Sequence, residues 1–185
     1  MLSSIDRRPK DFSEMIGNTD TVEQLQLLFK GKKENIPHLF LFHGKSGCGK
    51  TTLARIIKTK LECSDFDFYE YDTADNRGID TVREIKQKAN LKPMAGKTKI
   101  YLLDECHKMT SDGMNALLKI TEEPPAHVYF ILCTTDPEKL IPTLRSRATK
   151  YAVAPVHFKA MFKYLSAIAK EDEVEISDEA LENII

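Results

Sequence analysis

The 185-residue sequence predicts an α/β fold, in which a mostly parallel five-stranded sheet is flanked by helices and followed by the start of an all-helical unit. A glycine-rich loop separates an apolar run from a helical pattern, which is the strand, turn and helix order of a P-loop fold. The runs KIYLLD and VYFILCTT are apolar at successive positions, as is typical of strands covered on both faces. Strand and helix patterns alternate as far as residue 154, and only helical patterns follow.

The expected elements follow from these patterns. Apolar runs predict strands at residues 39–42, 68–72, 99–103, 128–134 and 149–153. Helical spacing of apolar residues predicts helices at residues 21–29, 52–61, 80–89, 111–125, 156–171 and 176–185. Ser177 can cap the last helix, which is too short to be stable alone. We therefore expect a first domain at residues 1–154 and the N-terminal part of a truncated helical domain at residues 155–185.

The stretch GKSGCGKT at residues 44–51 has the spacing G-x-x-x-x-G-K-[ST], in which glycines let backbone N–H groups surround phosphate oxygens. The residues expected to bind ATP are Gly44, Lys45, Ser46, Gly47, Cys48, Gly49, Lys50, Thr51 and Thr52. Lys50 would reach the β- and γ-phosphates, and the Thr51 hydroxyl would hold Mg²⁺. The alternative is an ordinary glycine turn, which the flanking strand and helix disfavour.

Two carboxylates, Asp104 and Glu105, follow the strand at 99–103. Ligands of open α/β sheets bind at that edge, so Asp104 is expected to contact Mg²⁺ and Glu105 to orient or polarise the attacking water. The alternative is a pair of solvated acids at a strand end. The run YFILCTTD ends in hydroxyl residues, which could contact the γ-phosphate or the water if this strand lies between the other two. A threonine with a routine strand role is the alternative there.

Composition excludes several classes of protein. The formal net charge of -1 excludes a globally basic nucleic-acid binder, but it does not exclude a local basic face. The cysteines and histidines show no metal-ligand spacing, so no zinc is expected. No window approaches the ~20 apolar residues that cross a bilayer, and the first residues lack the apolar core of a signal peptide. We expect a cytoplasmic protein without a membrane partner.

Residues 7–151 resemble the AAA+ ATPases, and specifically the motor subunits of DNA polymerase clamp loaders. The segment RRPKDFSEMIGN is similar to the family's R-P-x-x-F…I-G segment, which implies that Ile16 and Gly17 line the adenine pocket. The stretches NALLKITEEPP, ILCTTDPEKL and LRSRATKY resemble the gamma/tau subunit of bacterial DNA polymerase III. The stretch NRGIDTVRE is closer to the small subunits of replication factor C.

The resemblance also implies roles for single residues. It makes Lys50 and Thr51 the Walker A ligands and Asp104 and Glu105 the Walker B acids. Thr135 would be sensor 1, because it stands twelve residues before Arg147, which would be an arginine finger acting in trans. Spacing alone leaves Arg145 and Arg147 open as solvated loop charges.

The chain departs from the family at three places. Ala148 stands where the family has cysteine, and the bacterial zinc-binding insertion is missing between Cys63 and Phe68. The sensor 2 arginine and the collar would lie beyond Ile185. The first departure leaves the finger arginine in place, and the second agrees with the expectation of no zinc.

The resemblance implies an ATP-hydrolysing subunit that couples ATP to opening a sliding clamp and loading it on primer-template DNA. Its partners would be other clamp-loader subunits in a homo- or hetero-oligomeric pentamer, the clamp, and DNA. DNA phosphates would be contacted at helix N-termini by Arg77, Gly78, Lys108 and Thr110, unless these only begin the helices.

Other functions stay open at this point. A related AAA+ ATPase could remodel DNA in replication or recombination without loading a clamp. A small-molecule kinase shares the P-loop but needs an arginine-rich lid, which we do not find before Pro155. The motif DECH matches a D-E-x-H helicase signature, yet those enzymes need a second similar domain. A non-catalytic scaffold would not require the intact P-loop and both acids.

Overall fold

The computed structural model describes residues 8–174 and 176–184 and contains one five-stranded sheet in the order β2-β3-β4-β1-β5. All neighbouring strands in it are parallel. The strands are β1 (Leu39–His43), β2 (Cys63–Asp72), β3 (Thr98–Asp104), β4 (Val128–Thr134) and β5 (Thr149–Ala152). The predicted fold class is confirmed, and the sheet is fully parallel.

The helices of the described residues agree with the predicted pattern except in one place. They are α1 (Thr19–Lys30), α2 (Lys50–Lys60), α3 (Ile79–Ala89), α4 (Ser111–Glu122), α5 (Pro142–Arg147), α6 (Phe158–Glu171) and α7 (Asp178–Glu182). The segment with Arg145 and Arg147, predicted as a loop, forms the short helix α5. Pro142 is its first residue, and the fixed φ of proline suits a first helical turn.

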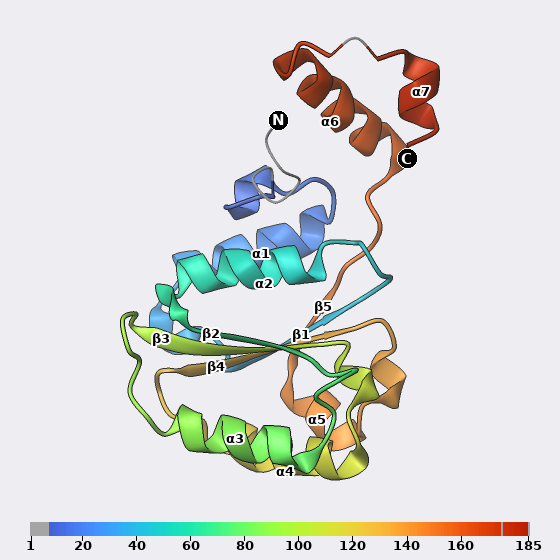
Figure 1. Ribbon diagram of the computed structural model, residues 1–185. Coiled ribbons are helices and arrows are strands. Elements are labelled where there is room, and N and C mark those ends of the chain that lie inside the picture. The colour runs from blue at the N-terminus through green and yellow to red at the C-terminus, as the bar shows by residue number, and fades with distance from the viewer. Residues whose placement is uncertain (1–7, 175, 185) are drawn as a thin grey trace.

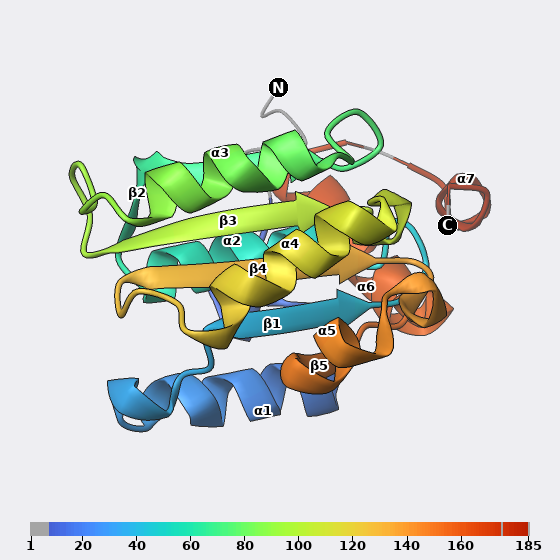
Figure 2. The same ribbon diagram turned by 90° about the horizontal axis from the view of Figure 1, so that it is seen from below.

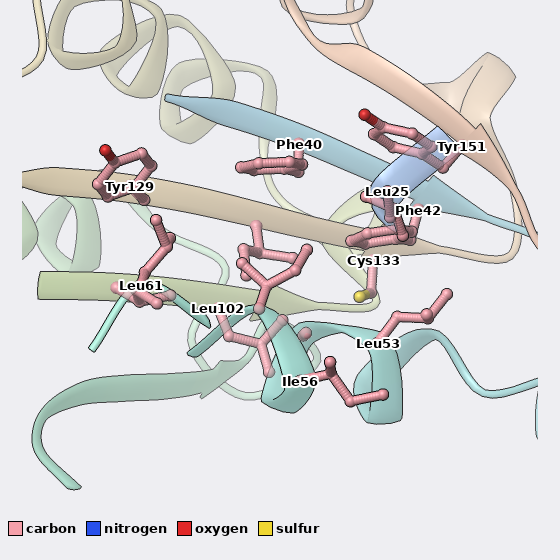
Figure 3. Close-up of a cluster of buried hydrophobic side chains, with 14 of the residues drawn as sticks. Leu25, Phe40, Phe42, Leu53, Ile56, Leu61, Leu102, Tyr129, Cys133 and Tyr151 are labelled. Carbon is pink, nitrogen blue, oxygen red and sulfur yellow. The ribbon is translucent and has the colours of Figure 1, made fainter. Parts of the chain in front are cut away.

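Helices cover both faces of the sheet, with α1 and α2 on one side and α3, α4 and α5 on the other (Figures 1 and 2). Strand β1 shows how its residues divide between these faces. Phe40 and Phe42 pack with Leu53 of α2 in the core drawn in Figure 3. Leu39 and Leu41 belong to the second core, against α3 and α4. The predicted burial on both faces is therefore confirmed.

The strand order determines which loops meet. Strand β4 lies between β1 and β3, which is the arrangement on which the predicted role of a β4 threonine depended. Because parallel strands end at the same edge of a sheet, the P-loop, the acids after β3 and the threonines after β4 come together there.

Beyond β5 the described chain contains only helices, as predicted. Ser177 caps α7, since its Oγ accepts a hydrogen bond from the backbone N–H of Ala180 at 3.2 Å. Figure 1 shows α6 and α7 beyond the helix layer formed by α1 and α2. That residues 155–185 begin a separate domain stays a prediction, and Arg7, where the resemblance begins, lies outside the described residues. Among the helices of the described chain, we find none that combines the length and apolar character needed to span a bilayer.

Candidate nucleotide-binding site

The loop between β1 and α2 has a backbone that only glycine can adopt at key points. Gly49, directly before α2, has φ 102°, in the left-handed region. A Cβ on Gly44 would lie 1.8 Å from the carbonyl oxygen of Val153, which no rearrangement of a side chain could relieve. The loop therefore turns tightly around the space in front of α2, as a phosphate-binding loop requires.

Lys50 is a buried cation with no acidic partner within the described residues. Its Nζ donates hydrogen bonds to the carbonyl oxygens of Gly44 and Lys45, both at 2.9 Å, and the residue is only 6% exposed. A buried charge with only neutral partners is costly, and an anion beside it would remove that cost. The P-loop thus fits the phosphate groups of a nucleotide.

Oxygen ligands suited to a divalent cation meet beside the P-loop. The Thr51 hydroxyl donates to Asp104 Oδ2 at 3.1 Å, and Asp104 Oδ1 accepts from the backbone N–H of Glu105 at 2.9 Å. A hydroxyl and a carboxylate are ligands that Mg²⁺ takes together with phosphate oxygens. These residues therefore fit Mg²⁺, which when bound would neutralise phosphate charge.

Glu105 has a strained backbone beside these ligands. Its φ of 50° and ψ of 37° lie in the left-handed region, which costs a non-glycine residue free energy. The buried Thr73 hydroxyl holds this turn, because it lies 2.9 Å from the carbonyl oxygen of Asp104 and 2.7 Å from that of Glu105. The Thr135 hydroxyl donates to Glu105 Oε2 at 3.3 Å. The structure thus places the predicted sensor threonine beside the predicted catalytic acid.

A cavity of about 390 Å³ opens between these groups. Its lining residues are Arg8, Ser46, Gly47, Gly49, Lys50, Thr51, Thr52, Arg55, Glu70, Asp104 and Glu105. Most predicted nucleotide and metal ligands are among them. Gly44 and Lys45 instead contribute the carbonyl oxygens that hold Lys50, and Cys48 is buried in the core beside α1 and α2.

Three lining residues were not predicted from the sequence: Arg8, Arg55 and Glu70. Arg55 and Glu70 form an ion pair at 3.0 Å on the cavity wall. Arg55 follows Thr51 by four residues, so helical spacing alone could have placed both on one face of α2. Glu70 could not be found that way, because its position depends on the register in which β2 pairs with β3.

Ile16 and Gly17, predicted to line the adenine pocket, lie outside this cavity lining. Their segment is held against the chain that follows β5. The Asn18 side chain donates to the Ala154 carbonyl at 2.9 Å and accepts from the Ala154 N–H at 2.7 Å. A Cβ on Gly17 would lie 3.5 Å from a methyl of Val156. Their contact with adenine stays a prediction.

Arg147 does not line the cavity of its own chain. Its Nη2 lies 2.9 Å from Glu122 Oε1 at the end of α4, and both side chains are about half exposed. Arg145, on the same helix, pairs with Glu138 instead. The location of Arg147 is compatible with action on a neighbouring chain, and that role stays a prediction.

The predicted DNA-contacting residues come together at the starts of α3 and α4. The Thr110 N–H donates to the Arg77 carbonyl at 2.9 Å, and Gly78 directly precedes α3. Arg77 and Lys108 are exposed. The Thr110 hydroxyl accepts from the Gly113 N–H at 3.1 Å and so caps α4. That hydrogen bond gives Thr110 a structural role, whereas contact with DNA stays untested for all four residues.

All four cysteines are free and buried. Burial raises the pKa of Cys63 to about 11, and it also raises the pKa of Cys106 and Cys133 well above the usual thiol value. These thiols therefore stay protonated and pack as small apolar groups. Within the described ranges, no three histidine, cysteine or acidic side chains lie together as a metal site.

Comparison with known proteins identifies the family. Residues 62–157 match the family described as DNA polymerase III, delta subunit. The DNA polymerase III subunit gamma/tau of Mycobacterium tuberculosis (strain ATCC 25618 / H37Rv) is 34% identical over 92% of this chain and 33% of its own length. The DNA polymerase III subunit gamma of Buchnera aphidicola subsp. Schizaphis graminum is also 34% identical, over 96% of this chain and 54% of its own.

Solved structures show the same fold. The Thermotoga maritima RuvB Holliday junction branch migration motor has a TM-score of 0.75 at 23% identity, over 95% of this chain and 58% of its own. A gamma subunit-related protein from the same organism has a TM-score of 0.64 at 26% identity, over 80% and 51%. The RuvB likeness supports the fold alone, whereas the sequence identities above extend over nearly the whole chain. The chain therefore belongs to the DNA polymerase III gamma/tau family, and it shares its fold with the RuvB motor.

Proposed function

We propose that this chain is the ATP-binding and ATP-hydrolysing part of a motor subunit in a DNA sliding-clamp loader. The convergence of Lys50, Thr51, Asp104, Glu105 and Thr135 at one sheet edge carries the proposal. Membership of the gamma/tau family supports the clamp-loader assignment. The chain spans between about a third and a half of the two gamma relatives described above, so the activity of the whole protein is part of the proposal.

The reaction is hydrolysis of the bond between the β- and γ-phosphates. Lys50 would bind phosphate oxygens, while Thr51 and Asp104 would hold Mg²⁺. The Glu105 carboxylate accepts a proton from water as the water oxygen attacks the γ-phosphorus and the bond to ADP breaks. Thr135 orients Glu105 through the hydrogen bond described above.

A neighbouring subunit completes the site in this proposal. Arg147 lies outside the cavity of its own chain, and a guanidinium in trans would stabilise the charge that develops on the γ-phosphate. ATP binding would then be coupled to the packing of the subunits. The ATP-bound subunits would form a pentameric ring that opens the clamp. Hydrolysis would release the clamp on primer-template DNA, with phosphate contacts at Arg77, Gly78, Lys108 and Thr110. The protein would act in the cytoplasm.

ATP turnover of the full-length protein with its partner subunits tests this proposal. We expect primer-template DNA and a sliding clamp to raise turnover. Arg147→Ala should abolish turnover and leave ATP binding intact, because the guanidinium acts only on a neighbour. Arg145→Ala is the matched control on α5 and should retain turnover.

Two results would reject parts of this account. If the isolated chain hydrolyses ATP and Arg147→Ala does not change its rate, the protein would be a self-contained P-loop enzyme, such as a small-molecule kinase. Stimulation by DNA without any response to a clamp would favour a related replication or recombination ATPase.

A further inference from the structure

The histidine of the DECH motif has no part in the reaction described above, yet its side chain lies inside the site. His107 belongs to a short 3-10 turn, Cys106–Lys108, directly after Glu105. Its side chain is only 12% exposed. It lies between the residues that end β3 and those that end β4.

The contacts of His107 converge on one ring nitrogen. Nδ1 lies 3.0 Å from Thr134 Oγ1 and 3.3 Å from Glu105 Oε2. Thr134 is fully buried, and its Oγ1 also accepts from the Asp136 N–H at 3.0 Å. The imidazole is thus held by a buried hydroxyl at the end of β4 while it faces the carboxylate of Glu105.

These contacts favour one tautomer of His107. An ionised carboxylate only accepts hydrogen bonds, so a lone pair on Nδ1 at 3.3 Å from Glu105 Oε2 would be repelled. A proton on Nδ1 is attracted to that oxygen and is also donated to Thr134. The arrangement therefore favours the Nδ1–H form.

We propose that His107 is a positioning residue for Glu105, an inference that rests on the proposed role of Glu105 in hydrolysis. His107 and Thr135 both approach Oε2 of Glu105. No hydrogen bond to Oε1 occurs within the described chain, so Oε1 is the oxygen left to accept the proton of water. His107 thereby restrains the carboxylate in one orientation.

Variants of His107 test this role in the full-length protein with its partner subunits. His107→Ala should lower kcat about 10- to 100-fold, because a misplaced catalytic group costs up to about 10² in rate, while KM for ATP changes less than about twofold. His107→Asn should recover most of the loss, since its amide nitrogen takes the place of Nδ1. His107→Gln should not, because its amide reaches the place of Nε2.

A matched control separates positioning from stability. His38 Nδ1 lies 2.6 Å from the Val128 carbonyl, where β1 and β4 begin, and the site lies where these strands end. His38→Ala removes a comparable hydrogen bond and should leave kcat unchanged. In a Glu105→Gln background, His107→Ala should cause no further loss of turnover. An additional loss there, or full turnover of His107→Ala alone, would overturn the proposal.

The tautomer provides a readout that does not require turnover. Long-range ¹H–¹⁵N spectra of the ¹⁵N-histidine-labelled chain, assigned with His107→Asn, should show His107 protonated at Nδ1. An unprotonated Nδ1 would overturn the inference even if ATP is hydrolysed. Absence of turnover in the unsubstituted assembly, with Nδ1–H present, would instead count against the proposed function.

Discussion

Two charged side chains of this site, Lys50 and Asp104, have few hydrogen-bond partners within the protein. The Lys50 ammonium has two carbonyl oxygens beside it, and the Asp104 carboxylate has one hydroxyl and one N–H. Phosphate and Mg²⁺ are the groups that would complete both environments. A magnesium nucleotide would supply both groups, and the contribution of each can be tested by itself.

Asp104→Asn tests the metal site. An amide is a weaker ligand than a carboxylate for a hard cation, so the Mg²⁺ concentration for half-maximal turnover should rise at least about tenfold. Nucleotide binding measured in EDTA should be unchanged. Asp72→Asn is the matched control, because Asp72 pairs with Asp104 in register at the end of β2 and does not line the cavity. An equal effect of both substitutions would remove Asp104 from the metal site.

At the scale of elements, one buried carboxylate joins the middle of β2 to the loop before β3. Asp67 is fully buried and accepts hydrogen bonds from the Ser64 hydroxyl and from the N–H groups of Met94, Ala95 and Gly96. Burial acts to raise the pKa of Asp67, but these hydrogen bonds outweigh it and hold the pKa well below its usual range. The ionised form is thus the one that stabilises this loop.

Asp67→Asn should lower the free energy of unfolding at pH 7 by about 2 kcal/mol, because an amide nitrogen would face backbone N–H donors. Urea denaturation measures this change. The exposed Asp65, paired with Lys58, supplies the control Asp65→Asn, for which we expect a much smaller change because solvent screens the pair. Equal destabilisation by the two substitutions would contradict the account.

The same carboxylate predicts a pH dependence. The pKa of Asp67 is depressed in the folded state, so its contribution is complete above the unfolded pKa of about 3.9 and is lost as pH falls toward the folded value. The unsubstituted protein should therefore lose more stability than Asp67→Asn between pH 5 and pH 2. Unfolding curves with the same pH dependence for both proteins would refute this assignment.

The elements also show what the sequence could predict. Strands β1, β3 and β4 are buried on both faces, so their apolar runs identified them. Strand β2 begins at Cys63, five residues before its predicted start at 68. The apolar pattern missed these residues because β2 is an edge strand with charged residues in its first half. The position of Thr135 beside Glu105 follows from the place of β4 between β1 and β3, whereas its role as a sensor stays a prediction. The position of Glu70 in the cavity wall and the contact of Asn18 with Ala154 depend on pairing between distant segments, which no local sequence pattern predicts.

Over the whole molecule, the segment before α1 contacts the chain that leads from β5 to α6. Asn18 forms two hydrogen bonds with Ala154, so Ile16 and Gly17 are held beside the segment between β5 and α6. Asn18→Ala should lower stability by about 1 kcal/mol. It should also weaken ATP binding several-fold if Ile16 and Gly17 contact adenine. Fluorescent-nucleotide titration measures this effect, with the exposed Asn35→Ala as control. ATP affinity equal to that of the control would remove this segment from the adenine pocket.

The central claim is that the sheet edge formed by β1, β3 and β4 hydrolyses ATP with Glu105 as the base. Single-turnover hydrolysis by Glu105→Gln, measured beside ATP binding in the assembled full-length protein, tests it most directly. We predict ATP affinity within about threefold of the unsubstituted protein and hydrolysis lower by about 10²- to 10⁴-fold, the usual contribution of a general base. Lys50→Ala should lose ATP binding itself. Hydrolysis by Glu105→Gln at the unsubstituted rate would contradict the account.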